Sequence, residues 1–147
     1  MIFLNDADIS ARLRDELRPL LAGADESVLH TIEAEAVSEA QTYLRTRFDV
    51  ALAFLPRPTT PEGEPAPDTR HHALVMYVTD MMVYHLYARL DPRQLPQLRQ
   101  DRYDQALRWL EWCSAGKLTP DLPALGGGDT PLSQRRYGSQ PRGSHYA

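Results

Sequence analysis

The side chains best suited to acid–base or metal chemistry lie between His71 and His85. His71 and His72 are adjacent, and Asp80 and His85 follow further along the same apolar segment. On a helix, side chains share a face when they are three or four residues apart, so these four do not converge on one point. We therefore expect no metal site, and interpret the histidines as a polar helix start and one half-buried side chain.

Asp80 is the most unusual of these residues because it lies in the middle of the apolar segment. A buried carboxylate needs a partner, because leaving it unpaired costs free energy. One interpretation is a general base. The favoured one is a structural residue, buried and polar, whose ion pair or hydrogen bond fixes the register of its helix. Candidate partners are Tyr84, one turn on, and three arginines of other helices: Arg45, Arg47 and Arg102.

No catalytic motif accompanies these residues. The sequence contains no G-x-S-x-G, no phosphate-binding loop of the Walker type and no H-E-x-x-H. Cys113 is the only cysteine, which excludes an internal disulfide and a cysteine-rich zinc site and fits synthesis in a reducing cytoplasm. We expect a protein that is not an enzyme and that needs no metal and no cofactor.

Charge is distributed unevenly along the chain. The formal net charge is -4, and residues 130–147 contain Arg135, Arg136 and Arg142 but no acid, which leaves -7 on residues 1–129. Prolines, glycines and serines after Lys117 leave little to form a core, so this arm is expected to be disordered when alone in water. Its arginines could contact DNA, weakly at physiological salt, or dock in an acidic groove of a protein.

The remaining pattern predicts an all-α fold: a small bundle of three main helices plus a short N-terminal helix. The N-terminal helix should be capped by Asn5, run for about ten to fifteen residues and end at Pro19 and Gly23. The main helices should begin at Asp25 or Ser27, near Thr69 and near Pro96, and end near Arg47, Leu90 and Gly116. We place a helical domain at 1–118, with a proline-rich loop at 49–68, and an extended C-terminal arm at 119–147.

The helix expected at 69–90 is apolar on every side, which is typical of a helix at the centre of a bundle. Its polar interruptions, among them Asp80, argue against a membrane span. Because only two other long helices are available to cover it, we expect it to face a neighbouring subunit as well. Tryptophan is enriched at interfaces, so Trp109 and Trp112 either face another subunit or cover the first helix or the proline-rich loop within one subunit. The expected subunit interface comprises Met76, Met82, Tyr87, Trp109 and Trp112.

Four stretches in this order resemble the Mu-like phage neck proteins, a family long described as a domain of unknown function. They read AEAVSEAQTYLRTRFDV at 34–50, MYVTDMMVYHLYAR at 76–89, RYDQALRWLEWCSAGKL at 102–118 and PDLP at 120–123. The resemblance covers about 5–123. The proline-rich segment at 56–67 is longer than the family pattern, so the contacts of this loop do not follow from the resemblance.

The family resembles the head–tail connector adaptors of long-tailed phages. The resemblance implies an adaptor subunit in the neck of the virion, forming a homo-oligomeric, dodecameric ring under the portal protein. Packaged DNA would pass through as transiting cargo, and a stopper or tail terminator protein would bind below; no membrane is involved. The alternative is a DNA-binding helical packaging accessory protein. The arm would bind the portal through Leu122, Leu125, Leu132, Arg135, Arg136, Tyr137, Arg142 and Tyr146.

Overall fold

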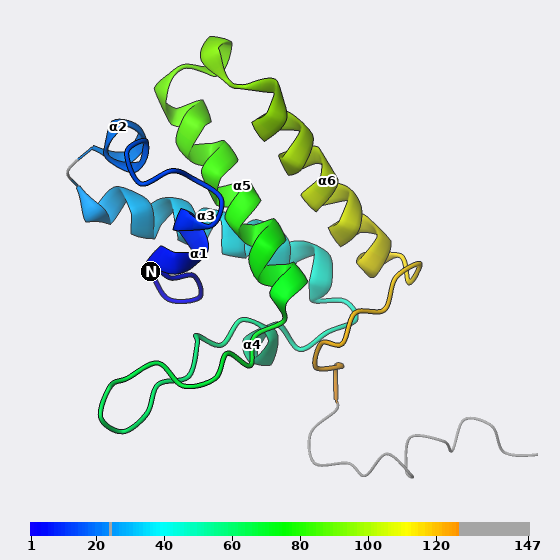
Figure 1. The fold of residues 1–147 in the computed structure, drawn as a ribbon. Helices are drawn as coiled ribbons and strands as arrows, with labels where there is room; N and C mark the ends of the chain where they lie inside the picture. Colours follow the sequence, from blue (N-terminus) through cyan, green and yellow to red (C-terminus); the bar gives the residue numbers. More distant parts are fainter. Residues whose placement is uncertain (24, 127–147) are drawn as a thin grey trace, which may run out of the picture.

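Three long helices form the body of the protein: α3 (Glu26–Leu44), α5 (His72–Leu90) and α6 (Gln97–Ser114). The computed structural model describes residues 1–23 and 25–126, and Figure 1 shows their arrangement. The all-α prediction is confirmed, because these residues form six α-helices and one 3-10 helix, η1 (Pro92–Gln94), and only isolated β-bridges. In the part of the chain that the structure describes, no helix is long and apolar enough to cross a membrane.

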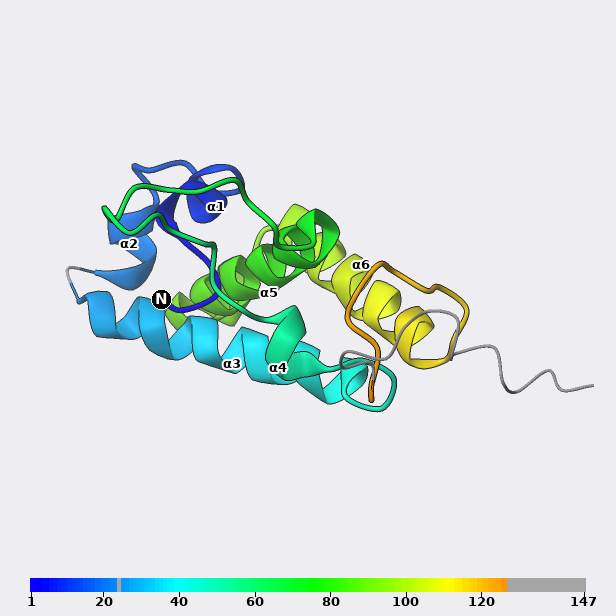
Figure 2. The same ribbon diagram turned by 90° about the horizontal axis from the view of Figure 1, so that it is seen from below.

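Helix α5 lies at the centre of the bundle, with α3 and α6 packed against it (Figures 1 and 2). Nine of its residues are buried, including Met81, Met82 and Val83. The N-terminal region covers much of the remaining surface through α1 (Asp6–Ser10) and α2 (Arg18–Ala22). The apolar surface of α5 is therefore covered largely within the subunit. Its apolarity does not require the neighbouring subunit that we expected from the sequence.

The N-terminal helix is shorter than predicted. Asn5 does cap α1: its side chain accepts from the amide of Asp8, whose carboxylate accepts from the amide of Asn5 in return. The prediction that this helix runs to Pro19 is wrong. Pro19 instead lies in the first turn of α2, where its fixed φ suits a helix and its missing N–H costs nothing.

A proline-rich hairpin at 56–68 follows α4 (Val50–Ala53) and projects away from the helices (Figures 1 and 2). Its two sides are joined by the bonds from Thr60 N to Glu64 O (2.8 Å) and from Ala66 N to Pro58 O (3.1 Å). Gly63 at the tip has a φ of 85°, which glycine adopts without strain. The prolines exclude longer strands. At the base of the hairpin, Phe54 is buried against Phe3.

Residues 117–126, which we call the strap, run back from the end of α6 to the end of α3. Asp49 N donates to Pro123 O (2.8 Å), and Leu125 N donates to Arg47 O (3.3 Å). Arg47 Nη1 donates to Cys113 O (2.6 Å) and Leu118 O (3.3 Å), so its guanidinium ties the strap to α6. The first eight residues of the predicted arm, 119–126, thus pack with the helical domain. Residues 127–147, which we call the tail, lie outside the described residues.

Candidate functional site

Asp80 is buried on α5, with 5% of its surface exposed. Its Oδ1 lies 3.8 Å from Arg12 Nε and 4.0 Å from Arg102 Nη1, and among the described residues it accepts no hydrogen bond. Burial raises the pKa of Asp80, while the charges of Arg12 and Arg102 oppose that rise. Arg102 was among the partners considered from the sequence. Arg12, which follows α1, was not among them.

His85 has a different partner, so it does not form a catalytic pair with Asp80. His85 Nε2 lies 3.0 Å from Glu39 Oε2, and the Tyr103 hydroxyl donates to Glu39 Oε1 at 2.6 Å. Tyr84 stacks on the Tyr103 ring with 4.0 Å between centroids. Burial, and then the hydrogen bond to Glu39, raise the pKa of the Tyr103 hydroxyl. Glu39 thus links α3 to both α5 and α6 through its two oxygens.

His71 and His72, the other two histidines of the segment 71–85, lie apart from Asp80 and His85. His71 caps α5, its ring nitrogen accepting from Leu74 N at 3.3 Å, and His72 is exposed. Within 1–23 and 25–126, no three histidine, cysteine, aspartate or glutamate side chains come together as metal ligands would. Cys113 is buried beside α5, and burial raises the pKa of its thiol to about 11.

The residues expected at a subunit interface occupy three different environments. Met82 is fully buried in the core of the subunit, so it has no surface to offer a neighbour, and its prediction as an interface residue is wrong. Met76, Tyr87 and Trp109 are half-buried; the Trp109 ring stacks on Tyr77 of α5 with 4.9 Å between centroids. Trp112 keeps 42% of its surface exposed. Trp112 is therefore the member of the set best placed to meet another molecule.

The residues expected to bind the portal are divided between the strap and the tail. Leu122 is half-buried and packs against the subunit's own core, whereas Leu125 is 53% exposed. The other six lie outside the described residues: Leu132, Arg135, Arg136, Tyr137, Arg142 and Tyr146. Since Leu122 is used within the subunit, the part of the arm free to contact a partner begins later than the sequence suggested.

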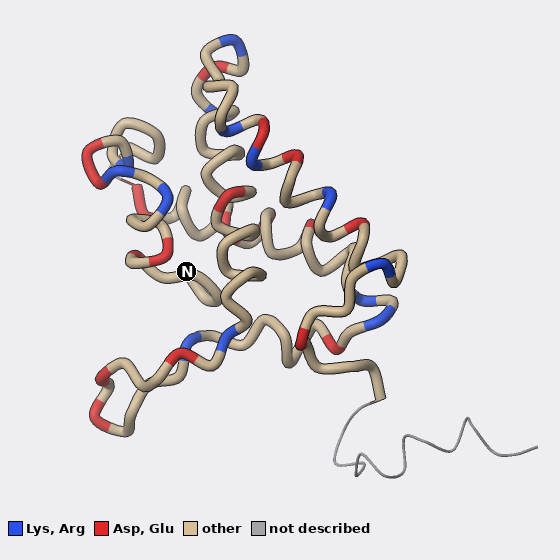
Figure 3. Tube along the Cα trace, turned by 45° about the vertical axis from the view of Figure 1, so that its right-hand side comes forward, with Lys and Arg blue, Asp and Glu red and all other residues tan. Residues whose placement is uncertain are grey.

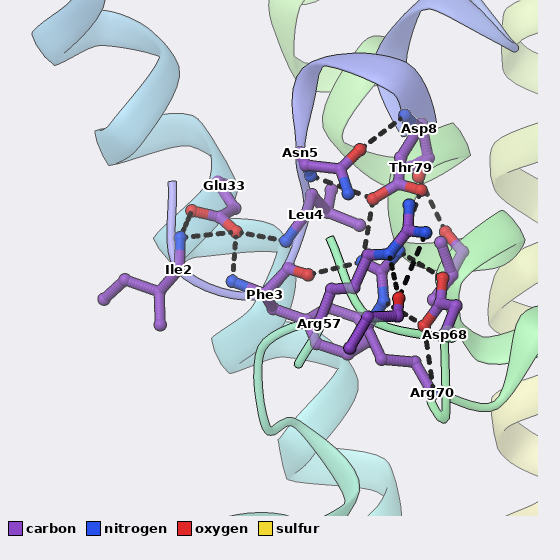
Figure 4. A network of polar contacts seen from close by, with 12 residues as sticks. Ile2, Phe3, Leu4, Asn5, Asp8, Glu33, Arg57, Asp68, Arg70 and Thr79 are labelled. Atoms are coloured by element: carbon purple, nitrogen blue, oxygen red, sulfur yellow. Dashed lines mark hydrogen bonds and ion pairs between the residues drawn. The ribbon is translucent and has the colours of Figure 1, made fainter. Parts of the chain in front are cut away.

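Glu33 is a buried carboxylate on α3, with 3% of its surface exposed. It accepts from three successive backbone amides of the N-terminal segment (Figure 4): Phe3 N at 2.8 Å, Leu4 N at 2.7 Å, and Ile2 N at 2.8 Å to its second oxygen. Such bonds to an ionised acceptor are among the stronger ones in proteins. The spacing contained the signal, since Glu33 is four residues after Leu29 and therefore on the buried side of α3.

Arg70 holds the same segment from the opposite side. Its Nη1 donates to Phe3 O at 2.6 Å and to Asp8 Oδ2 at 2.8 Å, and its Nη2 donates to Asp68 Oδ2 at 2.7 Å. The guanidinium is 2% exposed and sits between the two carboxylates (Figure 4). Its hydrogen bond lowers the pKa of Asp68 to about 2. Together, Glu33 and Arg70 fix the N-terminal segment against α3 and the base of the hairpin, and we call them the N-terminal clamp.

The family model described as Bacteriophage Mu, Gp36 matches residues 5–136, which is most of the chain and extends past the strap into the tail. No curated protein and no solved structure matches the chain.

Proposed function

Because the chain belongs to the Bacteriophage Mu, Gp36 family and is a phage structural protein, we propose that it serves as a head–tail adaptor in the neck of the virion. Its copies form a ring under the portal protein, and packaged DNA passes through the ring. The observation that carries this proposal is the family match over residues 5–136. It agrees with the resemblance found in the sequence, which points to the connector adaptors of long-tailed phages.

The charge of the protein supports a passage for DNA. The net charge of -7 on residues 1–129 repels a polyanion, so DNA can move past such a surface without being held by phosphate contacts. A packaging accessory protein that binds DNA, the alternative, needs basic residues instead. The arginines of the tail are too few to give more than weak phosphate binding at physiological salt.

The portal is the proposed partner of the tail. The strap fixes the chain up to Leu125 at the ends of α3 and α6, so the tail leaves the body from a defined place. A basic segment that orders on docking covers much surface of an acidic partner at a cost in entropy. On the opposite side of the ring, a stopper or tail terminator protein binds. The role is structural, with no catalysis and no membrane.

Portal binding tests the proposal directly. The mass of the purified chain is measured alone and mixed with the portal of the same phage. A chain ending at Gly126, which keeps all described residues, should fold but no longer bind portal. A second variant with Arg135, Arg136 and Arg142 changed to alanine should bind portal more weakly.

If the shortened chain binds portal as the full chain does, the proposed role of the tail is wrong. Salt-sensitive DNA binding lost in the arginine variant would favour the alternative function.

A further inference from the structure

We propose that the hairpin at 56–68 of one copy docks on the end of α6 of the next copy, and that this contact links subunits head to tail. The inference rests on the proposed ring and names the surfaces that would form it. The partner that we propose for the hairpin is thus a second copy of this chain. Two independent properties of the surface lead to this assignment: its charge and its apolar groove.

The hairpin is built as a fixed protrusion with an unused acidic tip. Its backbone bonds join Thr60 to Glu64 and Pro58 to Ala66, and Arg57 adds side-chain bonds to Ala66 O at 3.3 Å. A preorganised loop loses little conformational freedom on binding. Glu62 and Glu64 at the tip are exposed and form no ion pair with any described residue. Within residues 1–23 and 25–126 these two carboxylates therefore have no cationic partner.

An open groove lies at the foot of the hairpin, between its stem and the N-terminal segment. It has a volume of about 430 Å³, and its lining includes Met1, Ile2, Pro56, Pro58 and Pro65. Ile2 is 77% exposed at its edge. The N-terminal clamp holds one wall of this groove in place, because Glu33 binds the backbone of Ile2, Phe3 and Leu4. A rigid apolar groove beside an acidic tip fits an apolar anchor with cations beside it.

The C-terminal end of α6 presents such a surface. Trp112 is 42% exposed and Leu118 is 36% exposed, and Leu118 N donates to Trp112 O at 3.2 Å, which holds the two residues together. Four cations belong to this end of the molecule, against three nearby acids, Asp49, Glu111 and Asp121. The cations are Arg45, Arg47, Arg108 and Lys117, of which Arg45, Arg108 and Lys117 are exposed and in no ion pair with the described residues.

The two surfaces lie on opposite sides of the molecule. In Figures 1 and 2 the hairpin projects from one side, and the end of α6 with the strap lies at the other. Figure 3 shows acidic residues at the hairpin tip, and several basic residues with fewer acidic ones near the ends of α3 and α6. Contacts between two different surfaces of identical copies are head to tail. They generate a closed ring when repeating the rotation from one copy to the next returns to the first copy. Trp112 would then enter the groove, with Glu62 and Glu64 near Arg45 and Lys117 of the next copy.

Charge reversal tests this contact on the full chain. One variant carries E62K and E64K, and the other carries R45E and K117E; all four positions are exposed, so both variants should keep the unfolding temperature of the wild type. Each variant alone should assemble at least about tenfold more weakly than wild type by native mass, because like charges now face each other. An equimolar mixture should assemble again, since every contact in an alternating ring pairs opposite charges.

A second pair of variants tests the apolar anchor. W112A should weaken assembly, whereas L98A, which removes an even more exposed apolar side chain (54% against 42%) at the other end of α6, should not. The proposed contact is overturned if either charge variant assembles as wild type does, if the mixture stays unassembled, or if W112A and L98A behave alike. Rings that persist in these variants would contradict this contact and leave the adaptor function standing. A wild-type chain that remains monomeric with and without portal would overturn both.

Discussion

Changing Glu33 to alanine should destabilise the protein through its N-terminal segment. The substitution removes the acceptor of two buried amides, Phe3 N and Leu4 N, and of the partly buried Ile2 N. A buried donor left without a partner costs about 1–3 kcal/mol, so the free energy of unfolding should fall by about 3–5 kcal/mol. The third amide adds little, since Ile2 lies near water.

Changing Glu33 to glutamine should cost less. In the structure one oxygen, Oε1, accepts from both Phe3 N and Leu4 N, so an amide oxygen in the same place keeps both bonds. What is lost is the charge and the shorter of the two bonds from Ile2 N, the one to Oε2, where the amide nitrogen would now face another donor. Since bonds to ionised groups are stronger than neutral ones, we expect a loss of about 1–2 kcal/mol.

Urea unfolding followed by circular dichroism measures these free energies, and hydrogen exchange shows where the structure opens. The amides of Phe3 and Leu4 should lose protection in Glu33→Ala before those of α5 do. Glu35→Ala is the matched control: Glu35 is exposed on the same helix, so its loss should change stability by less than about 0.5 kcal/mol. If Glu33→Ala matched this control, or if glutamine cost as much as alanine, the account of Glu33 would be refuted.

Three further predictions concern the side chains of Asp68, Asp80 and Cys113. The pKa of Asp68, about 2, lies below its ordinary 3.8, so its pairing with Arg70 stabilises the fold at neutral pH. This contribution is lost as pH falls from about 4 toward 2. The difference in unfolding free energy between wild type and Asp68→Asn, measured with urea, should therefore shrink to zero over that range. The pKa of Asp80 is raised, so its ionisation destabilises the fold as pH rises above 3.8. Asp80→Asn should therefore have a melting temperature at or above that of wild type at neutral pH, and the same melting temperature in acid. A lower melting temperature of the variant at neutral pH would show that the charges of Arg12 and Arg102 outweigh the cost of burial. The thiol of Cys113, with a pKa of about 11 against 9.0 unfolded, should react with a disulfide reagent at mildly alkaline pH at least about a hundredfold more slowly in the native than in the denatured protein; equal rates would contradict its burial.

The long helices were predictable because their signals are local. The apolar spacing in α3, α5 and α6 and the cap at Asn5 each involve residues within one or two turns of one another. Pro19 was misread because the same residue both ends a helix before it and begins one after it. The choice between these depends on the packing of α2 against α5, which no local pattern contains.

The candidate site was less predictable than the helices, because its contacts join residues that are far apart in the sequence. Glu33 binds amides about thirty residues away, and Arg70 reaches Phe3 and Asp8 across more than sixty. A lone glutamate at a buried spacing suggests a partner without identifying it, and backbone amides have no signature in a sequence. Met82 was expected at an interface because α5 is apolar on every side, and this pattern does not show which of its residues the other helices cover.

The strap has a consequence for folding during synthesis. It joins the end of α3 to residues that the ribosome adds about seventy-five positions later, through the bonds from Asp49 N to Pro123 O and from Leu125 N to Arg47 O. The helices can pair as they emerge, but the end of α3 stays open until the strap has been made. A chain truncated before the strap would therefore leave the end of α3 uncovered.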